Sequence, residues 1–129
     1  MANNLNLAIY LHSDGLYLSS KNKSLKFLSA RKKLDIIGSA HNIKEIVLKK
    51  KQGCRLILFS KLFLVNYDKK APFLGIIKFN NFLKINKNLI PLGGINSGNL
   101  NSLSLINSKG FALMSEVKKK PANIINRLF

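Results

Sequence analysis

The sequence has one cysteine, three prolines, no tryptophan and only five acidic residues among its 129 residues. A single cysteine, Cys54, excludes an internal disulfide framework and a cysteine-based zinc cluster. No apolar run approaches the roughly 18 residues that a membrane-spanning helix needs. The first residues, Met1 to Asn4, carry no basic segment of a secretory signal. These absences predict a cytoplasmic location and no membrane partner.

The shortage of acidic residues leaves a strongly basic chain. Lys and Arg number 22 against 5 Asp and Glu, which gives a formal net charge of +17. Such a charge is typical of nucleic-acid-binding proteins, but sixteen Asn beside many Lys and Ile also fit a bias toward AT-rich codons. Lysines occur in nearly every expected helix, and no nucleic-acid-binding motif is visible. We therefore expect a basic surface that attracts small phosphorylated substrates, with nucleic-acid binding as the less favoured alternative.

Short apolar runs alternate with polar, lysine-bearing segments. Strands are expected at 15–18, 34–37, 55–59, 89–92 and 111–114. Helices are expected at 4–12, 24–33, 42–51, 76–82, 99–106 and 121–129, and 60–75 is the longest irregular stretch. The strand runs are apolar throughout, which suits parallel strands buried on both faces. This order predicts the α/β class, either an open doubly wound sheet or a partial (β/α)8 TIM barrel with parallel strands and outer helices.

The helix expected at 42–51 has the clearest end signals. Asn42 can cap its first turn, and Glu45 stands three residues later, which is the capping-box arrangement. Gly53 follows the last turn, where glycine commonly ends a helix.

Ligands in both architectures bind at the carboxyl ends of the strands. Gly93 and Gly94 directly follow the fourth expected strand, and two residues without side chains let a phosphate approach backbone N–H groups. The helix expected at 99–106 would add its dipole. Ser115 follows the fifth strand and can contribute a hydroxyl and an amide. The alternative is that the two glycines only form a tight turn.

The remaining polar residues give weaker signals. His41 follows the second expected strand, where it would contact a ligand or, as we favour, cap a backbone group. Asp14 and Asp35 each precede a strand, so no shared metal site is expected. Cys54 is expected as a small core residue.

Several segments resemble one known family, in order along the chain. The segments Leu-Ile-Pro-Leu-Gly-Gly-Ile-Asn at 89–96 and Gly-Phe-Ala-Leu-Met-Ser-Glu-Val at 110–117 resemble the last two strands of thiamine-phosphate synthases and the related thiazole tautomerases. Segments 14–18, 36–45 and 53–63 resemble three earlier segments of that family. The resemblance covers nearly the whole chain.

The resemblance implies a (β/α)8 barrel enzyme of thiamine biosynthesis. Its reaction joins hydroxymethylpyrimidine diphosphate to thiazole phosphate and releases pyrophosphate, which is transferase chemistry that needs positioning and charge stabilisation rather than a nucleophile. No catalytic residue is assigned. The implied site residues are Gly93, Gly94, Met114 and Ser115 for phosphate binding, and Ser39, His41 and Lys69 for substrate binding.

The resemblance also implies a Mg²⁺ cofactor. The family's two magnesium-binding Asp positions fall at Asn4 and Asn22. Asn is a poorer ligand for this ion because it lacks the negative charge of Asp.

Residues 1–129 are expected as a single thiamine-phosphate synthase-like domain that lacks the first two to three strands of the barrel. We favour a truncated or divergent member of the family, which predicts that this chain alone is inactive. In the alternatives, a second copy or another chain supplies the missing strands. The function would then be that of a non-catalytic, barrel-completing subunit, and a basic nucleic-acid-binding module is the other alternative.

Overall fold

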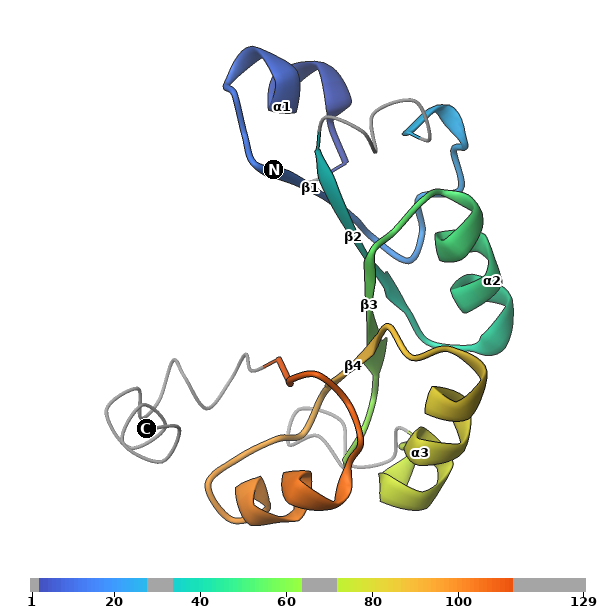
Figure 1. Ribbon diagram of the computed structural model, residues 1–129, viewed down its shortest axis with the longest axis vertical. Coiled ribbons are helices and arrows are strands. Elements are labelled where there is room, and N and C mark those ends of the chain that lie inside the picture. Colours follow the sequence, from blue (N-terminus) through green and yellow to red (C-terminus); the bar gives the residue numbers. More distant parts are fainter. Residues whose placement is uncertain (1–2, 28–33, 64–71, 113–129) are drawn as a thin grey trace. The chain divides into compact units, whose positions relative to one another are not determined.

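The computed structural model describes residues 3–27, 34–63 and 72–112 (Figure 1). The contacts divide the chain into two compact units, Met1–Phe59 and Ser60–Phe129, and each is described by itself. In the first unit, the strands β1 (Gly15–Leu18), β2 (Asp35–Ala40) and β3 (Leu56–Ser60) pair in that order. Strands and helices alternate along most of the chain, so the predicted α/β class is confirmed.

The first unit contains two parallel strand pairs. The β1–β2 register places Tyr17 opposite Ile37, and the β2–β3 register places Ser39 opposite Leu58. Parallel neighbours in chain order with a helix between them are the βαβ arrangement. The elements are α1 (Leu5–Tyr10), β1 (Gly15–Leu18), β2 (Asp35–Ala40), α2 (Ile43–Lys51) and β3 (Leu56–Ser60).

Helix α2 begins and ends where the sequence predicts. The Asn42 side chain accepts a hydrogen bond from the Glu45 N–H at 3.0 Å and so caps the first turn. Gly53 has a φ of 85°, a left-handed conformation that glycine adopts without a steric cost and that stops the helix. The local end signals were therefore sufficient to define this helix.

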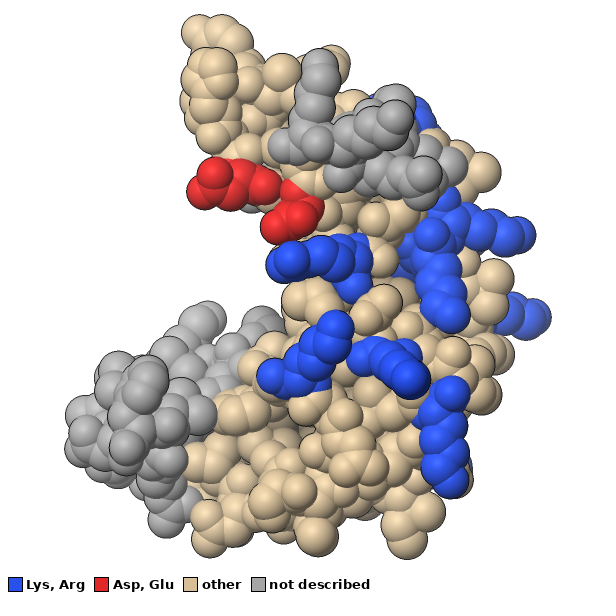
Figure 2. Space-filling model, in the orientation of Figure 1, with Lys and Arg blue, Asp and Glu red and all other residues tan. Residues whose placement is uncertain are grey.

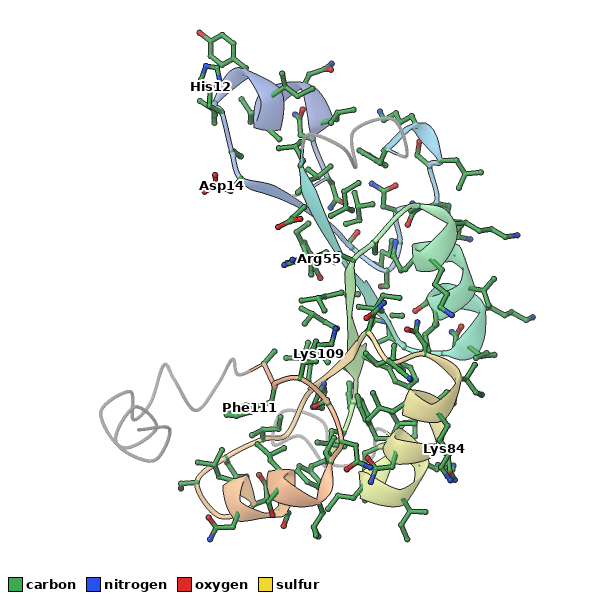
Figure 3. The ribbon with its side chains drawn as sticks, in the orientation of Figure 1. His12, Asp14, Arg55, Lys84, Lys109 and Phe111 are labelled. Carbon is green, nitrogen blue, oxygen red and sulfur yellow. The ribbon has the colours of Figure 1, made fainter. Side chains whose placement is uncertain are left out.

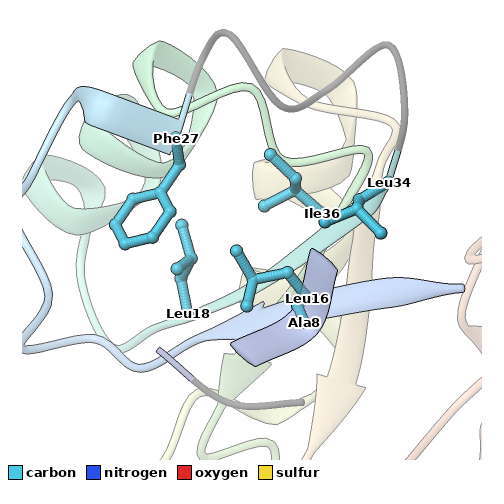
Figure 4. Packing of buried hydrophobic residues seen from close by; sticks show 6 residues of the cluster. All are labelled: Ala8, Leu16, Leu18, Phe27, Leu34 and Ile36. Carbon is cyan, nitrogen blue, oxygen red and sulfur yellow. The ribbon is translucent and has the colours of Figure 1, made fainter. Parts of the chain in front are cut away.

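The hydrophobic core of the first unit lies on one face of the sheet (Figure 4). Leu16, Leu18 and Ile36 are buried there. In β1 and β3 the intervening residues are only partly buried. The expectation of strands fully buried on both faces was therefore wrong for β1 and β3, because the described residues cover the second face incompletely. The core cluster consists of Ala8, Leu16, Leu18, Phe27, Leu34 and Ile36.

The second unit contains helix α3 (Gly75–Ile85), strand β4 (Leu89–Leu92) and the 3-10 helix η2 (Leu100–Leu105). Phe79 and Leu83 lie one turn apart and form the buried face of α3. The Ala112 N–H donates to the Pro91 carbonyl at 2.9 Å, which starts a parallel pairing with β4. This single bridge lies within the fifth expected strand, whose last two residues lie outside the described part.

Three expected helices differ from the structure. Helix α1 spans Leu5–Tyr10 instead of the expected 4–12. Helix α3 extends to Ile85, beyond the predicted end at Phe82. Residues 100–105 form a 3-10 helix rather than the expected regular helix, because their Asn and Ser side chains compete for backbone hydrogen bonds. Most of the helix expected at 24–33, and all of that at 121–129, lies outside the described residues.

Exposed lysines occur on both units (Figure 2). Lys44, Lys50 and Lys51 are exposed on α2, and Lys78 and Lys84 are exposed on α3. This spread over separate helices favours a compositional origin of the charge over one dedicated basic face. In the described ranges, no helix combines the length and the apolar character that crossing a membrane would require.

Candidate functional site

Two hydroxyl groups meet on the face of the first unit that lies opposite the core cluster. The Tyr17 hydroxyl donates to Ser39 Oγ at 2.8 Å, and Ser39 is only 7% exposed. Both residues lie near the carboxyl ends of their strands, where ligands of this fold class bind. Ser39 is a predicted substrate residue, whereas Tyr17 was missed. The signal was available, since Tyr17 alternates with the buried Leu16 and Leu18.

His41 lies just past β2, as predicted, and its partner is a carboxylate. His41 Nδ1 lies 3.2 Å from Glu45 Oε2, and the His41 backbone N–H donates to the same oxygen at 2.6 Å. Glu45 therefore caps the helix entry, and the imidazole contacts the Glu45 carboxylate instead of the expected backbone group. Because the His41 side chain is 50% exposed, it can still reach a ligand.

At the two positions implied to bind magnesium, the side-chain oxygens already accept hydrogen bonds from backbone N–H groups. Asn4 Oδ1 accepts from the Leu7 N–H at 3.0 Å, and Asn22 Oδ1 accepts from the Ser24 N–H at 3.1 Å. Neither side chain carries the charge that Mg²⁺ prefers. No cluster of three or more His, Cys, Asp or Glu that could hold a metal occurs among the described residues. The donor set at these positions therefore does not fit Mg²⁺.

The aspartates near the sheet lie at the other end of the strands. Asp14 directly precedes β1 (Figure 3), and its carbonyl accepts from the Asp35 N–H at 3.2 Å. The Asp35 carboxylate pairs with Arg55 at 3.5 Å. These residues mark the amino ends of β1 and β2, away from the carboxyl-end positions where a ligand would bind.

The glycine pair after β4 forms a tightly packed turn in the second unit. Gly93 and Gly94 have φ values of 105° and 69°, which side-chain-bearing residues rarely adopt. A Cβ on Gly93 would lie 3.1 Å from Lys61 Cα. The Gly93 carbonyl accepts from the Phe63 N–H at 3.0 Å, so the strand end and the Lys61 segment are joined. Glycine is thus required here by the backbone, and phosphate binding stays a prediction.

Two asparagines fix the chain after this turn. Asn99 Nδ2 donates to the Gly94 carbonyl at 2.8 Å, and Asn99 Oδ1 accepts from the Asn96 N–H at 2.8 Å. Asn96 Oδ1 in turn accepts from the Gly98 N–H at 2.8 Å. Both asparagines were missed as contributors to the site. Their Asn-x-x-Asn spacing after a glycine pair was the available signal, because Asn side chains commonly stabilise turns.

The predicted help of a helix dipole at this turn is wrong. Only a six-residue 3-10 helix follows, beginning at Leu100, and the dipole effect falls off within one turn. The other implied site residues of this region, Met114, Ser115 and Lys69, lie outside the described residues.

A cavity of about 250 Å³ opens beside β4 and η2. Its lining is mainly apolar, with one cation from Lys109 (Figure 3). Neither Gly93 nor Gly94 lines it, so it is separate from the glycine turn. The lining residues are Pro91, Leu103, Ser104, Ile106, Ser108, Lys109, Gly110 and Phe111.

The first unit also buries a lysine that sequence reasoning missed. Lys49 on α2 is 0% exposed, and Gln52, also 0% exposed, accepts a hydrogen bond from its ammonium at 2.8 Å. Burial lowers the pKa of Lys49, and the charges of Cys54 and Glu45 oppose that change. Burial also raises the pKa of the Cys54 thiol to about 11, against the opposing effect of Lys49. The prediction of Cys54 as a residue near the core is consistent with its partial burial.

Cys54 should react slowly with thiol reagents while the protein is folded. Its pKa of about 11, raised from 9.0, leaves less thiolate at any pH below the new value. At pH 8 we expect alkylation about 100-fold slower than in a short peptide, since the thiolate is the reactive form. Mass spectrometry of iodoacetamide-treated protein measures the rate. Equal rates in native protein and in concentrated urea would contradict the prediction.

The parallel strands and the alternating helices define a protein of the α/β class. The chain belongs to the thiamine monophosphate synthase family, whose model matches residues 1–117. The predicted family resemblance is therefore confirmed.

Two known proteins are similar to the chain. It is 29% identical over 116 residues to the thiamine-phosphate synthase of Prochlorococcus marinus, covering 86% of this chain and 33% of the relative. It matches the structure of thiamine phosphate pyrophosphorylase from Pyrococcus furiosus with a TM-score of 0.72 at 16% identity, covering 97% of this chain and 64% of that protein. The second match shows the fold and supports the TIM-barrel alternative over the open sheet. The chain spans about a third of one relative and under two thirds of the other.

Proposed function

We propose that this chain supplies the thiazole phosphate-binding part of a thiamine-phosphate synthase-like transferase in thiamine biosynthesis. The observation that carries the proposal is the turn at Gly93 and Gly94, where two residues without side chains, both with positive φ values, directly follow the carboxyl end of β4. Small phosphate esters are bound by backbone N–H groups in such glycine turns. Met114 and Ser115 are proposed as further phosphate contacts, from the family resemblance.

The proposed reaction is displacement of pyrophosphate from hydroxymethylpyrimidine diphosphate by the thiazole nitrogen. It asks the protein to position two substrates and to stabilise the charge of the leaving group. Ser39 and His41 are proposed contacts of the pyrimidine diphosphate, and Lys69 is proposed to supply charge near it. Because Asn4 and Asn22 do not fit Mg²⁺, no step through a metal is part of this proposal.

Residues 1–129 are proposed as one barrel domain without the first two to three strands of the barrel. The coverage of only 64% of the solved relative supports this view. We accordingly expect no turnover by this chain alone with both substrates.

The same coverage favours a second candidate function, that of a subunit completing the barrel of another chain. Light scattering after size-exclusion chromatography tests it. If this chain stays a monomer when it is mixed with other chains of the family, that role is contradicted.

Binding of thiamine phosphate tests the proposed function directly. Calorimetric titration of the chain should show one site that binds thiamine phosphate at least about tenfold more tightly than unphosphorylated thiamine, because the phosphate carries the contacts. Thiamine is the matched control ligand. Absence of heat at millimolar thiamine phosphate, or equal affinity for the two compounds, would refute the proposal.

A further inference from the structure

Lys49 is a cationic residue whose side chain is buried in the first unit. It stands first in a run of three lysines in the last turn of α2, and the other two, Lys50 and Lys51, are exposed. Lys49 is 0% exposed. A buried ammonium is costly unless it is hydrogen-bonded to satisfied partners, so its contacts indicate what it does.

The Lys49 ammonium binds the loop that follows β1. Its Nζ donates to the Asn22 carbonyl at 2.8 Å and to Gln52 Oε1 at 2.8 Å. Gln52 Nε2 donates to the same Asn22 carbonyl at 2.9 Å and to the Ser24 carbonyl at 2.8 Å. Three of these hydrogen bonds therefore join the end of α2 to two carbonyls of one loop, and the fourth links the two donor side chains. The donors lie about thirty residues away in sequence, so the loop is held by tertiary contacts.

The neighbouring strand makes room for the Lys49 stem. A Cβ on Gly38 of β2 would lie 2.6 Å from Lys49 Cδ and 3.2 Å from Lys49 Cγ. The stem thus passes over a glycine on its way to the loop. A packed stem and a satisfied head group together form a built arrangement rather than a chance burial.

The loop held in this way contains one of the two positions at which the family resemblance implies a magnesium ligand. Here the Asn22 side chain is bound to the Ser24 N–H, and the Asn22 carbonyl is bound to an ammonium. A divalent cation at this position would meet like charge from Lys49 and no carboxylate. In the observed contacts, the Lys49 side chain supplies the cationic group that binds this loop.

We propose that Lys49 is a positioning residue whose buried ammonium holds the loop at Asn22 to Ser24 in place, and that this loop does not bind Mg²⁺. The proposal does not depend on phosphate binding at Gly93 and Gly94, so either can fail alone. It predicts that the conformation of the loop is independent of magnesium and dependent on the charge of Lys49.

Amide hydrogen exchange of the full chain tests both parts. In the wild type, millimolar Mg²⁺ should leave the exchange of peptides covering Asn22 to Ser24 unchanged and should give no heat of binding. The variant Lys49→Met keeps an apolar stem and should exchange at these peptides about tenfold faster or more, because hydrogen bonds to a charged donor are lost. Lys50→Met on the same helix is the matched control and should exchange like the wild type.

A chemical rescue separates the charge of Lys49 from its packing. In Lys49→Ala, added n-propylammonium should restore slow exchange of the loop, whereas n-propanol, a neutral molecule of similar shape, should not. Magnesium that slows loop exchange in the wild type would overturn the proposal, and so would unchanged exchange in Lys49→Met or equal rescue by the alcohol. The magnesium experiment uses only the native chain, so the proposal stays falsifiable if both variants fail to fold.

Discussion

Gly93→Ala should abolish binding of thiamine phosphate and destabilise the second unit by about 2–4 kcal/mol, from backbone strain and overpacking together. The new Cβ would lie 3.1 Å from both Cα and Cβ of Lys61, and the φ of 105° is strained for alanine in any surroundings. Because the crowding atoms include main-chain Lys61 Cα, the turn itself must move. Calorimetric titration measures the binding, and urea unfolding measures the stability.

Gly110→Ala is the matched control for that change. A Cβ there has no atom within 4 Å, and Gly110 is exposed in the same unit. Its affinity should equal that of the wild type, with stability changed by no more than about 0.5 kcal/mol. If Gly93→Ala bound thiamine phosphate as the wild type does, the turn would not be the phosphate site. If only its stability fell, the glycine would serve the fold alone.

Phe79→Ala should cost the second unit about 3–5 kcal/mol, the usual range for removing a buried aromatic side chain. Phe79 is 0% exposed and forms the buried face of α3 with Leu83. That loss is a large part of the total stability of a small domain, about 5–15 kcal/mol. Hydrogen exchange of peptides from α3 and β4 would detect the opening of this unit.

Ile77→Ala on the same helix is the control for Phe79→Ala. Ile77 is 80% exposed, so its truncation should change stability by less than about 0.5 kcal/mol. The two variants remove apolar atoms two residues apart from opposite faces of one helix. Similar losses for both would show that α3 packs in another orientation, with Ile77 covered.

The elements that could be predicted are those whose ends are set by local chemistry. Helix α2 follows from Asn42, Glu45 and Gly53, which act within one turn of its ends. Strand β4 has its predicted bounds, Leu89–Leu92, because the glycine pair ends it. The family resemblance was likewise predictable, since it rests on short segments that are local in sequence.

The elements that could not be predicted depend on residues far apart in the chain. Helix α3 continues to Ile85 because tertiary packing of Leu83 supports its last turn. The Tyr17–Ser39 contact depends on the register of β1 and β2, which sequence spacing does not reveal. Asn99, expected in a helix, instead binds the Gly94 carbonyl. Its spacing from Asn96 was a local signal for a turn, but the same residues also fit the start of a helix, and the sequence does not decide between the two.

The buried lysine was missed for a different reason. Lys49, Lys50 and Lys51 are identical in sequence, and only the helical position distinguishes the one that faces inward. A strongly basic composition also made every single lysine look like a surface residue. Composition therefore gave no indication that Lys49, which the proposed loop arrangement requires, is buried.

The lysine run gives the chain an unequal tolerance of genetic change. Deleting one of its three codons would leave a sequence of almost the same composition, with two lysines still in the last turn. Every residue after the deletion would rotate by about 100° around the helix axis and shift by about 1.5 Å along it. Gln52 would then leave the carbonyls of Asn22 and Ser24 that it now binds. A one-codon deletion in this run should therefore be more harmful than exchange of Lys50 or Lys51 for another residue.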